Sequence, residues 1–327
     1  MHYSITHRMK RLRSSHNIRS MLAETRLNIN QFIAPIFIND NITTKNPVKS
    51  MPGQFVHCID SLNAEIDSIS NLNIPAVLLF GVPKYKDEVG SCSTIDDGII
   101  QRAIQKIRAH NPDITIIADV CLCEYTSHGH CGILNKHNRI DNDKTLDILA
   151  KQAVSFANAG ADIVAPSSMT DGMVGAIRTA LDKNLHQETA ILSYAVKYSS
   201  NFYGPFREAL EGAPKFGDRK SYFMNHANAK EAIREAFLDI EEGADILMVK
   251  PAMNYLDIIH QIKYNFPEIP LCAYQVSGEY AMIKLGAQNG LFDEEQMILE
   301  SLLAIKRAGA DLIISYFAKD IAKLISG

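Results

Sequence analysis

Short apolar runs rich in β-branched residues alternate along this chain with longer segments in which apolar residues recur at helical spacing. The runs predict eight strands, because each is short, apolar and bounded by turn-forming residues. The predicted strands are Phe32–Ile38, Ala76–Phe80, Thr115–Val120, Ile163–Ala165, Ala190–Val196, Ile246–Val249, Leu271–Gln275 and Leu312–Tyr316. Helical periodicity follows them, most clearly at Lys144–Asn158, Ala227–Glu242, Tyr280–Ala287 and Glu294–Ala308.

The tripeptide Gly-Ala-Asp occurs at 160–162, 243–245 and 309–311, each time between a helical pattern and the next predicted strand. Glycine is a natural C-cap, and the aspartate can end the turn before the strand begins. Eight strand–helix units without a dividing linker predict an α/β protein with a (β/α)8 TIM barrel. A doubly wound open sheet is the alternative, but no glycine-rich phosphate loop follows the first predicted strand.

The first predicted strand begins only near residue 32. Residues 1–31 are therefore expected to form an extended N-terminal arm, and residues 32–327 the catalytic barrel. An arm outside a barrel needs a surface to lie on, and a neighbouring subunit is the expected surface.

Composition narrows the possible partners. The 327 residues are 46% hydrophobic and 21% charged, which is typical of a globular protein with a full core. The net charge of −4 gives no electrostatic reason to expect nucleic acid or an anionic membrane. No apolar run approaches the length of a membrane span, and the first residues lack the apolar core of a signal peptide. We therefore expect a cytoplasmic protein with reduced thiols.

Three of the six cysteines lie within eleven residues, directly after the third predicted strand. Cys121, Cys123 and Cys131 would gather three thiolates at one strand end, a donor set suited to zinc with one coordination position left open. A disulfide or a chance cluster of free thiols is the alternative. His128 and His130 are either additional ligands or hydrogen-bonding residues of the loop.

Unusual polar residues follow the other strands, where barrel enzymes carry their chemistry. Asp119 ends the third strand, Lys197 the fifth and Lys250 the sixth. A single lysine at a strand end is usually a solvated charge. Two on neighbouring strands disfavour each other's charge, and a neutral amine can attack a ketone to form a Schiff base.

The loop after the fifth strand contains Phe202–Arg207 and Gly217–Lys220. Its aromatic residues and glycines suit a lid, and its arginines suit a bidentate grip on a carboxylate. Taken alone it would be a basic solvated loop, but it lies between the two lysine strands.

The chain resembles the porphobilinogen synthase family, also called 5-aminolaevulinate dehydratases, over nearly its whole length. The matching stretches are Arg11–Arg13, Pro35–Phe37, Met51–Gly53, Glu124–Gly132, Lys197–Ser200, Phe202–Arg207, Gly217–Tyr222, Met248–Ala252, Tyr274–Met282, Lys306–Asp311 and Ser315–Phe317. The resemblance implies condensation of two 5-aminolaevulinate molecules to porphobilinogen, with loss of two waters, in tetrapyrrole biosynthesis.

Residue roles follow from the same resemblance. Lys250 matches the lysine that forms a Schiff base with one substrate, whose carboxylate Ser277 and Tyr316 hold. Lys197 matches the lysine that engages the second substrate, whose carboxylate Arg207 and Arg219 hold. The cysteine triad matches the site of the zinc-dependent branch, and Asp119 beside it is a candidate for proton transfer.

Two further properties of the family can be carried over. Some members bind an activating magnesium through a glutamate that matches Glu235, although an exposed acidic helix face is an equally simple interpretation. The family forms homo-octamers in which an N-terminal arm embraces a neighbour. Phe223 departs from the pattern, since many relatives carry glutamine there.

Two other functions remain as alternatives. A Schiff-base aldolase on the same barrel needs one lysine and no metal, so it leaves Lys197 and the cysteine triad unexplained. A non-catalytic zinc-binding assembly protein would be expected to have lost Lys250, Ser277 or Tyr316, and all three are present.

Overall fold

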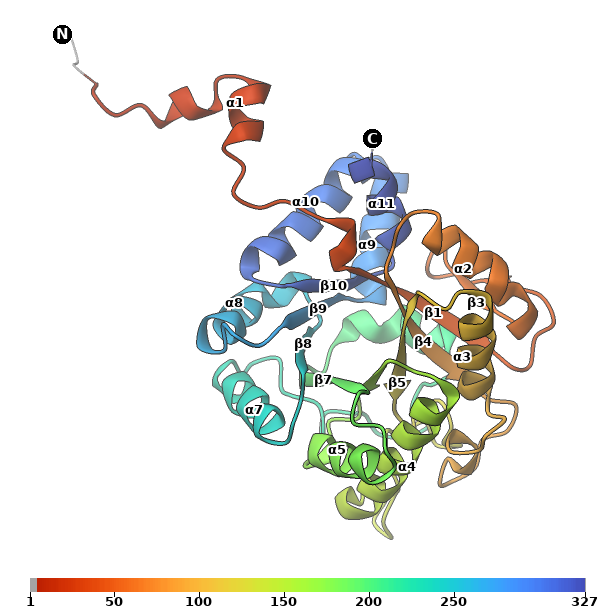
Figure 1. Cartoon of the computed structure of the whole chain (residues 1–327). Coiled ribbons are helices and arrows are strands. Elements are labelled where there is room, and N and C mark those ends of the chain that lie inside the picture. Colours follow the sequence, from red (N-terminus) through yellow and green to blue (C-terminus); the bar gives the residue numbers. More distant parts are fainter. Residues whose placement is uncertain (1–4, 327) are drawn as a thin grey trace.

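The computed structural model describes residues 5–326, and their strands form a closed parallel barrel surrounded by helices (Figure 1). The strand order is β10-β9-β8-β7-β6-β5-β4-β1, and pairing of β1 with β10 closes the barrel. The predicted (β/α)8 TIM barrel is confirmed. The barrel strands are β1 (Phe32–Asn39), β4 (Ala76–Val82), β5 (Thr115–Val120), β6 (Ile163–Pro166), β7 (Ala190–Lys197), β8 (Ile246–Lys250), β9 (Leu271–Gln275) and β10 (Leu312–Ser315).

Each predicted strand agrees with an observed one to within two residues at its ends. Two short strands that the sequence pattern did not reveal lie beside β1. They are β2 (Asn46–Pro47) and β3 (Phe55–His57), and β3 pairs with the end of β1 through Phe37 and Ile38. Proline and exposed polar residues in β2 hide it from any search for apolar runs.

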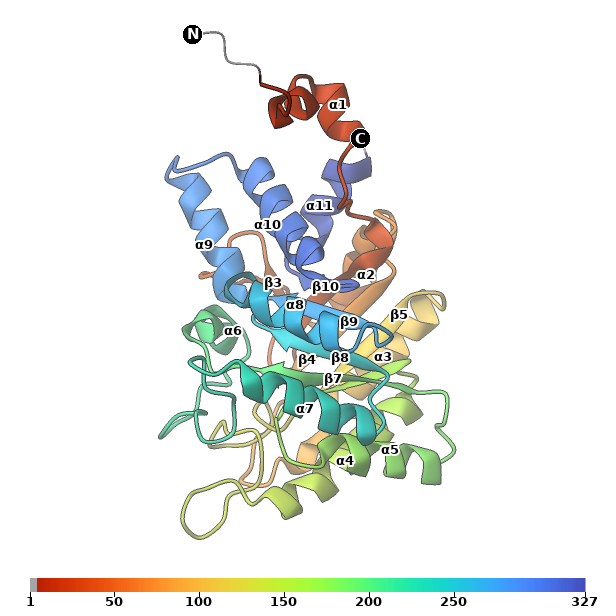
Figure 2. The same cartoon turned by 90° about the vertical axis from the view of Figure 1, so that its left-hand side faces the viewer.

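Most α-helices of the barrel region pack around the outside of the strands, whereas α6 lies across the end of the barrel at which Lys250 is found (Figures 1 and 2). They are α2 (Leu62–Ser70), α3 (Ile99–His110), α4 (Asn142–Ala159), α5 (Met173–Lys183), α6 (Gly204–Ala209), α7 (Lys230–Glu241), α8 (Leu256–Asn265), α9 (Ser277–Gln288), α10 (Glu294–Ala308) and α11 (Ala318–Ser326). The short 3-10 helices are η1 (Met9–Arg13), η2 (Ile29–Gln31), η3 (Ile59–Ser61), η4 (Ser91–Ser93), η5 (Asn201–Tyr203) and η6 (Met253–Tyr255).

The three Gly-Ala-Asp repeats fix the starts of neighbouring strands. Each glycine has a positive φ, as a helix C-cap requires: 106° at Gly160, 101° at Gly243 and 126° at Gly309. Each aspartate then accepts a hydrogen bond from the first or second residue of the preceding strand. These carboxylate–amide distances are 2.7 Å for Asp162–Ile116, 2.7 Å for Asp245–Ile191 and 2.9 Å for Asp311–Leu271. The repeat therefore sets strand register at the end of the barrel opposite the predicted site.

The N-terminal segment stands away from the barrel in both views (Figures 1 and 2). Neither η1 nor α1 (His16–Met21) contains a buried residue. Contact with the barrel core begins at Leu27 and Ile29. Residues 1–4 of the predicted arm and residue 327 of the predicted barrel domain lie outside the described residues. Among the described residues, no helix is long and apolar enough to cross a membrane.

Candidate active site

Lys197 and Lys250 are the last residues of β7 and β8, and they are direct partners in the register between these strands. Both are buried in this chain, with 6% and 4% of their surface exposed. The expectation that adjacent strands bring the two lysines together is confirmed by this register. Two ammonium groups in one dry pocket would repel each other, so at least one amine is favoured in its neutral form.

The Lys250 amine lies among aromatic rings. Its Nζ is 4.1 Å from the ring centroid of Tyr274 and 5.0 Å from those of Phe206 and Tyr194. Burial, followed by the charge of Lys197, lowers the pKa of Lys250 to about 7. Near neutral pH a substantial fraction of this amine is therefore unprotonated and nucleophilic.

The Lys197 amine has a polar partner as well as aromatic ones. Its Nζ donates a hydrogen bond to the Ser167 carbonyl oxygen at 2.5 Å. The ring of Phe223 lies 4.3 Å from the same Nζ, and that of Tyr194 lies 5.3 Å away. Tyr194 thus stands between the two lysines.

Ser167 connects Asp119 with Lys197. Its carbonyl oxygen accepts from Lys197, and its Oγ donates to Asp119 Oδ2 at 3.1 Å. Burial, followed by the charge of Glu124, raises the pKa of Asp119 to about 7. Its Oδ1 is buried and has no hydrogen-bond partner among the described residues. An unpaired buried carboxylate oxygen with this pKa can accept or release a proton, or hold a substrate amine.

The cysteine triad assembles because the loop after β5 folds back on itself. Thr126 Oγ1 donates to the His130 carbonyl at 2.9 Å, which returns the chain so that Cys131 faces Cys121 and Cys123. The three sulfur atoms all lie within 4.8 Å of one another, and the Cys121–Cys123 Sγ distance is 3.4 Å. All three cysteines are buried and none forms a disulfide. The donor set fits a soft metal ion, so this cluster could bind a metal.

The pKa values of the three thiols are shifted in different directions. Burial favours the neutral form of Cys131, but hydrogen bonds from Cys121 and Cys123 and the charge of Arg219 outweigh it and lower the Cys131 pKa. Burial raises the pKa of Cys121, and hydrogen bonding within the triad raises that of Cys123. A cation that replaces the shared protons would relieve this competition.

His128 and His130 do not belong to the metal-ligand groups found among the described residues. His128 Nε2 pairs with the Glu88 carbonyl at 3.1 Å. His130 contacts the Tyr222 hydroxyl at 3.1 Å and the Phe216 carbonyl at 3.0 Å. Both histidines are therefore hydrogen-bonding residues, but these partners lie in other segments and not within the cysteine loop itself.

Arg207 and Arg219 come from the two parts of the predicted lid. Arg219 is buried, and its Nη2 donates to the carbonyl oxygens of Gly129 (2.8 Å) and Gly212 (2.6 Å). The Nε atoms of both arginines are buried without a hydrogen-bond partner among the described residues. Buried guanidinium donors left unpaired are suited to an anionic group such as a carboxylate.

Ser277 and Tyr316 lie on the other side of Lys250. The Ser277 hydroxyl donates to the Phe202 carbonyl at 3.2 Å and accepts from the Phe206 amide at 3.0 Å. Tyr316 exchanges a 3.0 Å hydrogen bond with Tyr274, whose ring lies under Lys250. Ser277 can donate to a substrate only by leaving the Phe202 carbonyl.

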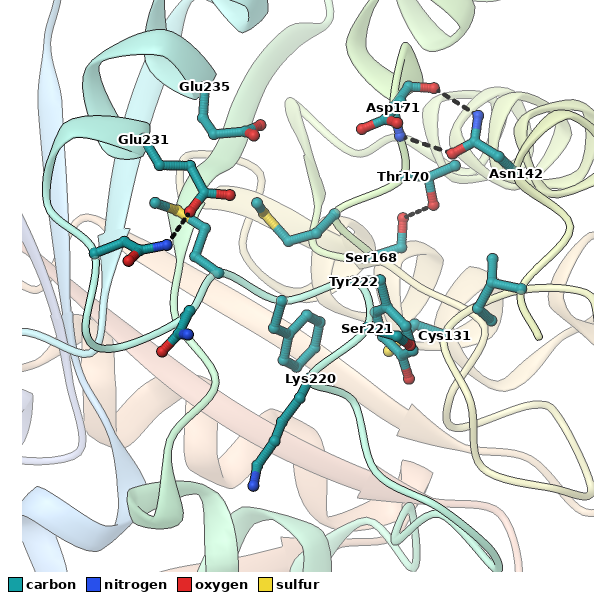
Figure 3. A pocket seen from close by; sticks show the side chains of 16 residues that line it. Cys131, Asn142, Ser168, Thr170, Asp171, Lys220, Ser221, Tyr222, Glu231 and Glu235 are labelled. Carbon is teal, nitrogen blue, oxygen red and sulfur yellow. Dashed lines mark hydrogen bonds between the residues drawn. The ribbon is translucent and has the colours of Figure 1, made fainter. Parts of the chain in front are cut away.

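A polar cavity of about 390 Å³ opens beside the triad (Figure 3). Cys131 lines one part of it, and Glu231 and Glu235 of α7 line another, with Asp171 across the cavity. Burial, followed by the charge of Glu231, raises the pKa of Glu235. Neither lysine is among the lining residues, but Phe223 lines this cavity and also contacts Lys197.

The aromatic residues around the lysines could not be identified from spacing. Strict alternation in β7 would place Tyr194 and Lys197 on opposite faces, because they are three residues apart. A register shift between Ser193 and Val196 removes that alternation and brings both side chains to the interior. Only a signal for the bulge could have revealed this, and the sequence carries none.

Comparisons with known proteins identify the family of this chain. A family model described as delta-aminolevulinic acid dehydratase matches residues 6–324. A delta-aminolevulinic acid dehydratase from Halalkalibacterium halodurans is 52% identical over 319 residues, covering 98% of this chain and 97% of the relative. One from Archaeoglobus fulgidus is 52% identical over 316 residues, covering 97% of both chains.

The solved structures include a close match. It is the crystal structure of delta-aminolevulinic acid dehydratase (porphobilinogen synthase) from Toxoplasma gondii in complex with the reaction product porphobilinogen. It superposes with a TM-score of 0.95 at 41% identity, covering 98% of this chain and 92% of that one.

Proposed function

The chain belongs to the delta-aminolevulinic acid dehydratase family, and from this premise we propose that it joins two molecules of 5-aminolaevulinate into porphobilinogen through Schiff bases on Lys250 and Lys197. The reaction releases two waters and belongs to tetrapyrrole biosynthesis. The observation that carries the proposal is the pair of buried lysines in direct register at the ends of β7 and β8.

Lys250 is the proposed nucleophile toward the first substrate. Its pKa of about 7 leaves neutral amine available near neutral pH, and the surrounding rings exclude water. Attack on the ketone forms a C–N bond and expels water, which leaves an iminium that acidifies the neighbouring carbon. Ser277 and Tyr316 would bind the carboxylate of this substrate, once Ser277 releases the Phe202 carbonyl.

Lys197 is the proposed amine for the second substrate. The unpaired Nε donors of Arg207 and Arg219 support a binding site for the carboxylate of this second substrate. Asp119 is linked to Lys197 through Ser167, and its free Oδ1 is our candidate for moving a proton or orienting a substrate amine.

Zinc is the proposed metal of the triad. Cys121, Cys123 and Cys131 would hold it through three buried sulfur atoms, a number that leaves one position open. When bound there, zinc supplies Lewis-acid polarisation of a substrate oxygen. A cytoplasmic location, which keeps thiols reduced, is part of the proposal because thiolates must stay reduced to bind the metal.

An activating magnesium bound through Glu235 is a further part of the proposal. Glu235 and Glu231 face the polar cavity, across which Asp171 lies (Figure 3). Carboxylate oxygens are preferred ligands of magnesium, and the bound ion would neutralise the repulsion between the negative charges of Glu231 and Glu235.

Glu235→Ala is expected to abolish stimulation by magnesium while zinc-dependent turnover remains. Unchanged stimulation would place the ion elsewhere.

The test of the reaction is porphobilinogen formation from 5-aminolaevulinate under reducing conditions, with and without a zinc chelator. Activity that disappears on chelation and returns with zinc is expected. If porphobilinogen still forms in the presence of the chelator, the proposed reaction stands but the catalytic role of zinc is wrong. If no product forms with any metal, a non-catalytic assembly protein is favoured.

Borohydride reduction tests the role of Lys250. Substrate should be trapped on Lys250, as mapped by mass spectrometry, and Lys250→Ala should abolish this adduct. Undiminished trapping in the variant would assign the first Schiff base to another residue. Trapping of one substrate without porphobilinogen formation would favour an aldolase.

A further inference from the structure

Glu279 is a fully buried carboxylate in the first turn of α9, with 0% of its surface exposed. Both of its oxygen atoms accept backbone hydrogen bonds. Oε1 accepts from the Met253 amide at 2.6 Å, and Oε2 accepts from the Val276 amide at 2.8 Å and the Ala252 amide at 3.4 Å. A single side chain thus connects the loop after β8 with the loop after β9.

Each of these loops adjoins a residue with a proposed role toward the first substrate. Lys250 lies two residues before Ala252, and Ser277 directly follows Val276. The Lys250 carbonyl oxygen is held separately, by the Tyr198 amide at 2.9 Å and the Tyr203 hydroxyl at 3.4 Å. The backbone around Lys250 is therefore held on two sides. The Lys250 carbonyl oxygen binds residues that follow β7, and Glu279, which follows β9, binds the amides of Ala252 and Met253.

We propose that Glu279 is a positioning residue that holds the Lys250 loop and the Ser277 loop at the separation needed for one substrate to engage both. The inference rests on the proposed roles of Lys250 and Ser277. The hydrogen bonds that Glu279 accepts come from backbone amides, so it would act through the two loops and not on the substrate.

Helix capping alone does not account for this arrangement. A glutamate at the third helical position that accepts the Val276 amide is an ordinary capping interaction. The bonds to Ala252 and Met253 are different, because these residues follow another strand and contribute nothing to α9. Burial raises the pKa of Glu279 to about 7, so keeping a carboxylate here has a cost that a surface cap would avoid.

Glutamine is the discriminating substitution because it preserves size and shape. A carboxylate offers two acceptor oxygens, whereas an amide offers one oxygen and an NH₂ group. Since both oxygens of Glu279 face backbone N–H donors, either orientation of the amide must place NH₂ against one of the loops. Glu279→Gln therefore replaces at least one of these hydrogen bonds by two donors facing each other, at Met253 or at Val276 and Ala252, without opening a cavity.

The experiment measures the rate of borohydride trapping of 5-aminolaevulinate on Lys250 in the full chain, together with kcat, KM, bound zinc and far-UV circular dichroism. Glu279→Gln is expected to slow trapping and lower kcat by about ten- to a hundredfold, as a small misplacement of a reacting group does. Bound zinc and the dichroism spectrum should remain unchanged. Glu279→Asp keeps the charge but is one methylene shorter, so it should also slow trapping.

Asp311→Ala is the matched control. Asp311 accepts the amide of Leu271 at the other end of β9, so its loss loosens the same strand away from the site. This variant should lose thermal stability but keep the wild-type trapping rate.

Three results would overturn the inference: wild-type trapping in Glu279→Gln, equal slowing in Asp311→Ala, or loss of zinc, helicity and trapping together in both Glu279 variants. The last result would assign Glu279 to the stability of the whole barrel. Absence of a Lys250 adduct in the wild-type chain would instead refute the proposed function, so the two failures are distinguishable.

Discussion

At the scale of single residues, the site depends on two lysines in one dry pocket. Their direct register means that neither can be charged without affecting the other. Lys197 has the Ser167 carbonyl as a hydrogen-bond acceptor, whereas Lys250 is surrounded by aromatic rings. The apolar surroundings of Lys250 favour its neutral amine.

The pH dependence of trapping tests this effect. Lys250 is protonated below its pKa of about 7, so trapping on Lys250 should rise as the pH increases through 7. The charge of Lys197 contributes to the low pKa, and Lys197→Gln should therefore shift the midpoint to higher pH. At pH 7 a rise of one pKa unit should lower the trapping rate about fivefold, because the neutral fraction of Lys250 falls from about one half to about one tenth.

Lys319→Gln is the control for this shift. Lys319 pairs with Glu65 at 2.5 Å and is not among the groups that perturb Lys250. Its substitution should leave the midpoint in place. An unmoved midpoint in Lys197→Gln would mean that burial alone lowers the pKa of Lys250.

The sequence predicted the lysines and cysteines because their chemistry is unusual at strand ends. It could not predict the partners that these residues have in the folded chain. Tyr194 is brought beside Lys197 by a bulge, and Ser277 is bonded to Phe202, which lies 75 positions earlier in the sequence. Such contacts depend on backbone geometry that leaves no periodic trace in the sequence.

At the scale of elements, the sequence predicted the barrel strands well because apolar runs, glycine caps and aspartates agree with one another. The Gly-Ala-Asp repeats are an example, since each contributes a positive-φ cap and a carboxylate that binds the preceding strand. The β2–β3 pair was missed because both strands are very short, and β2 is exposed and contains proline. Local pattern thus identifies elements that build the core and misses those added at its edge.

The close approach of α9 to η5 gives a prediction at this scale. A Cβ added to Gly278 would lie 2.6 Å from the Phe202 carbonyl oxygen and 2.7 Å from the Phe202 Cα. Both are backbone atoms, so the two elements would have to separate. Gly278→Ala should lower stability by about 1–3 kcal/mol and reduce kcat, since Ser277 would lose its place. Thermal unfolding and steady-state kinetics measure both effects.

Gly204→Ala is the comparison for that variant. Gly204 begins α6 in the same region, has a helical backbone with φ of −52°, and has open space around an added Cβ. Alanine there should be neutral or slightly stabilising, because it reduces the freedom of the unfolded chain. Equal behaviour of the two variants would show that the α9–η5 approach carries no cost.

At the scale of the whole molecule, the proposed site residues all belong to the barrel, whereas residues 5–26 of the arm include no buried residue. The apolar side chains of the arm are largely exposed: Ile5 50%, Met9 68%, Leu12 49%, Met21 77% and Leu22 50%. A helix of six residues, the length of α1, is not stable in water without packing against another surface. We therefore propose that a second copy of the chain provides this surface, consistent with an octameric assembly.

Removing residues 1–26 should reduce the size of the assembly without unfolding the barrel. The truncation spares Leu27 and Ile29, which already pack against the core, so barrel dichroism and zinc binding should remain. Sedimentation velocity should detect smaller species, because the exposed apolar side chains that would be buried between subunits are gone.

A full-length chain in which Met9, Leu12 and Met21 are changed to serine separates apolar contact from arm length. This variant should also form smaller species if apolar contact holds the subunits together. Unchanged sedimentation of the truncated chain would mean that the arm takes no part in assembly and that its apolar residues serve another surface.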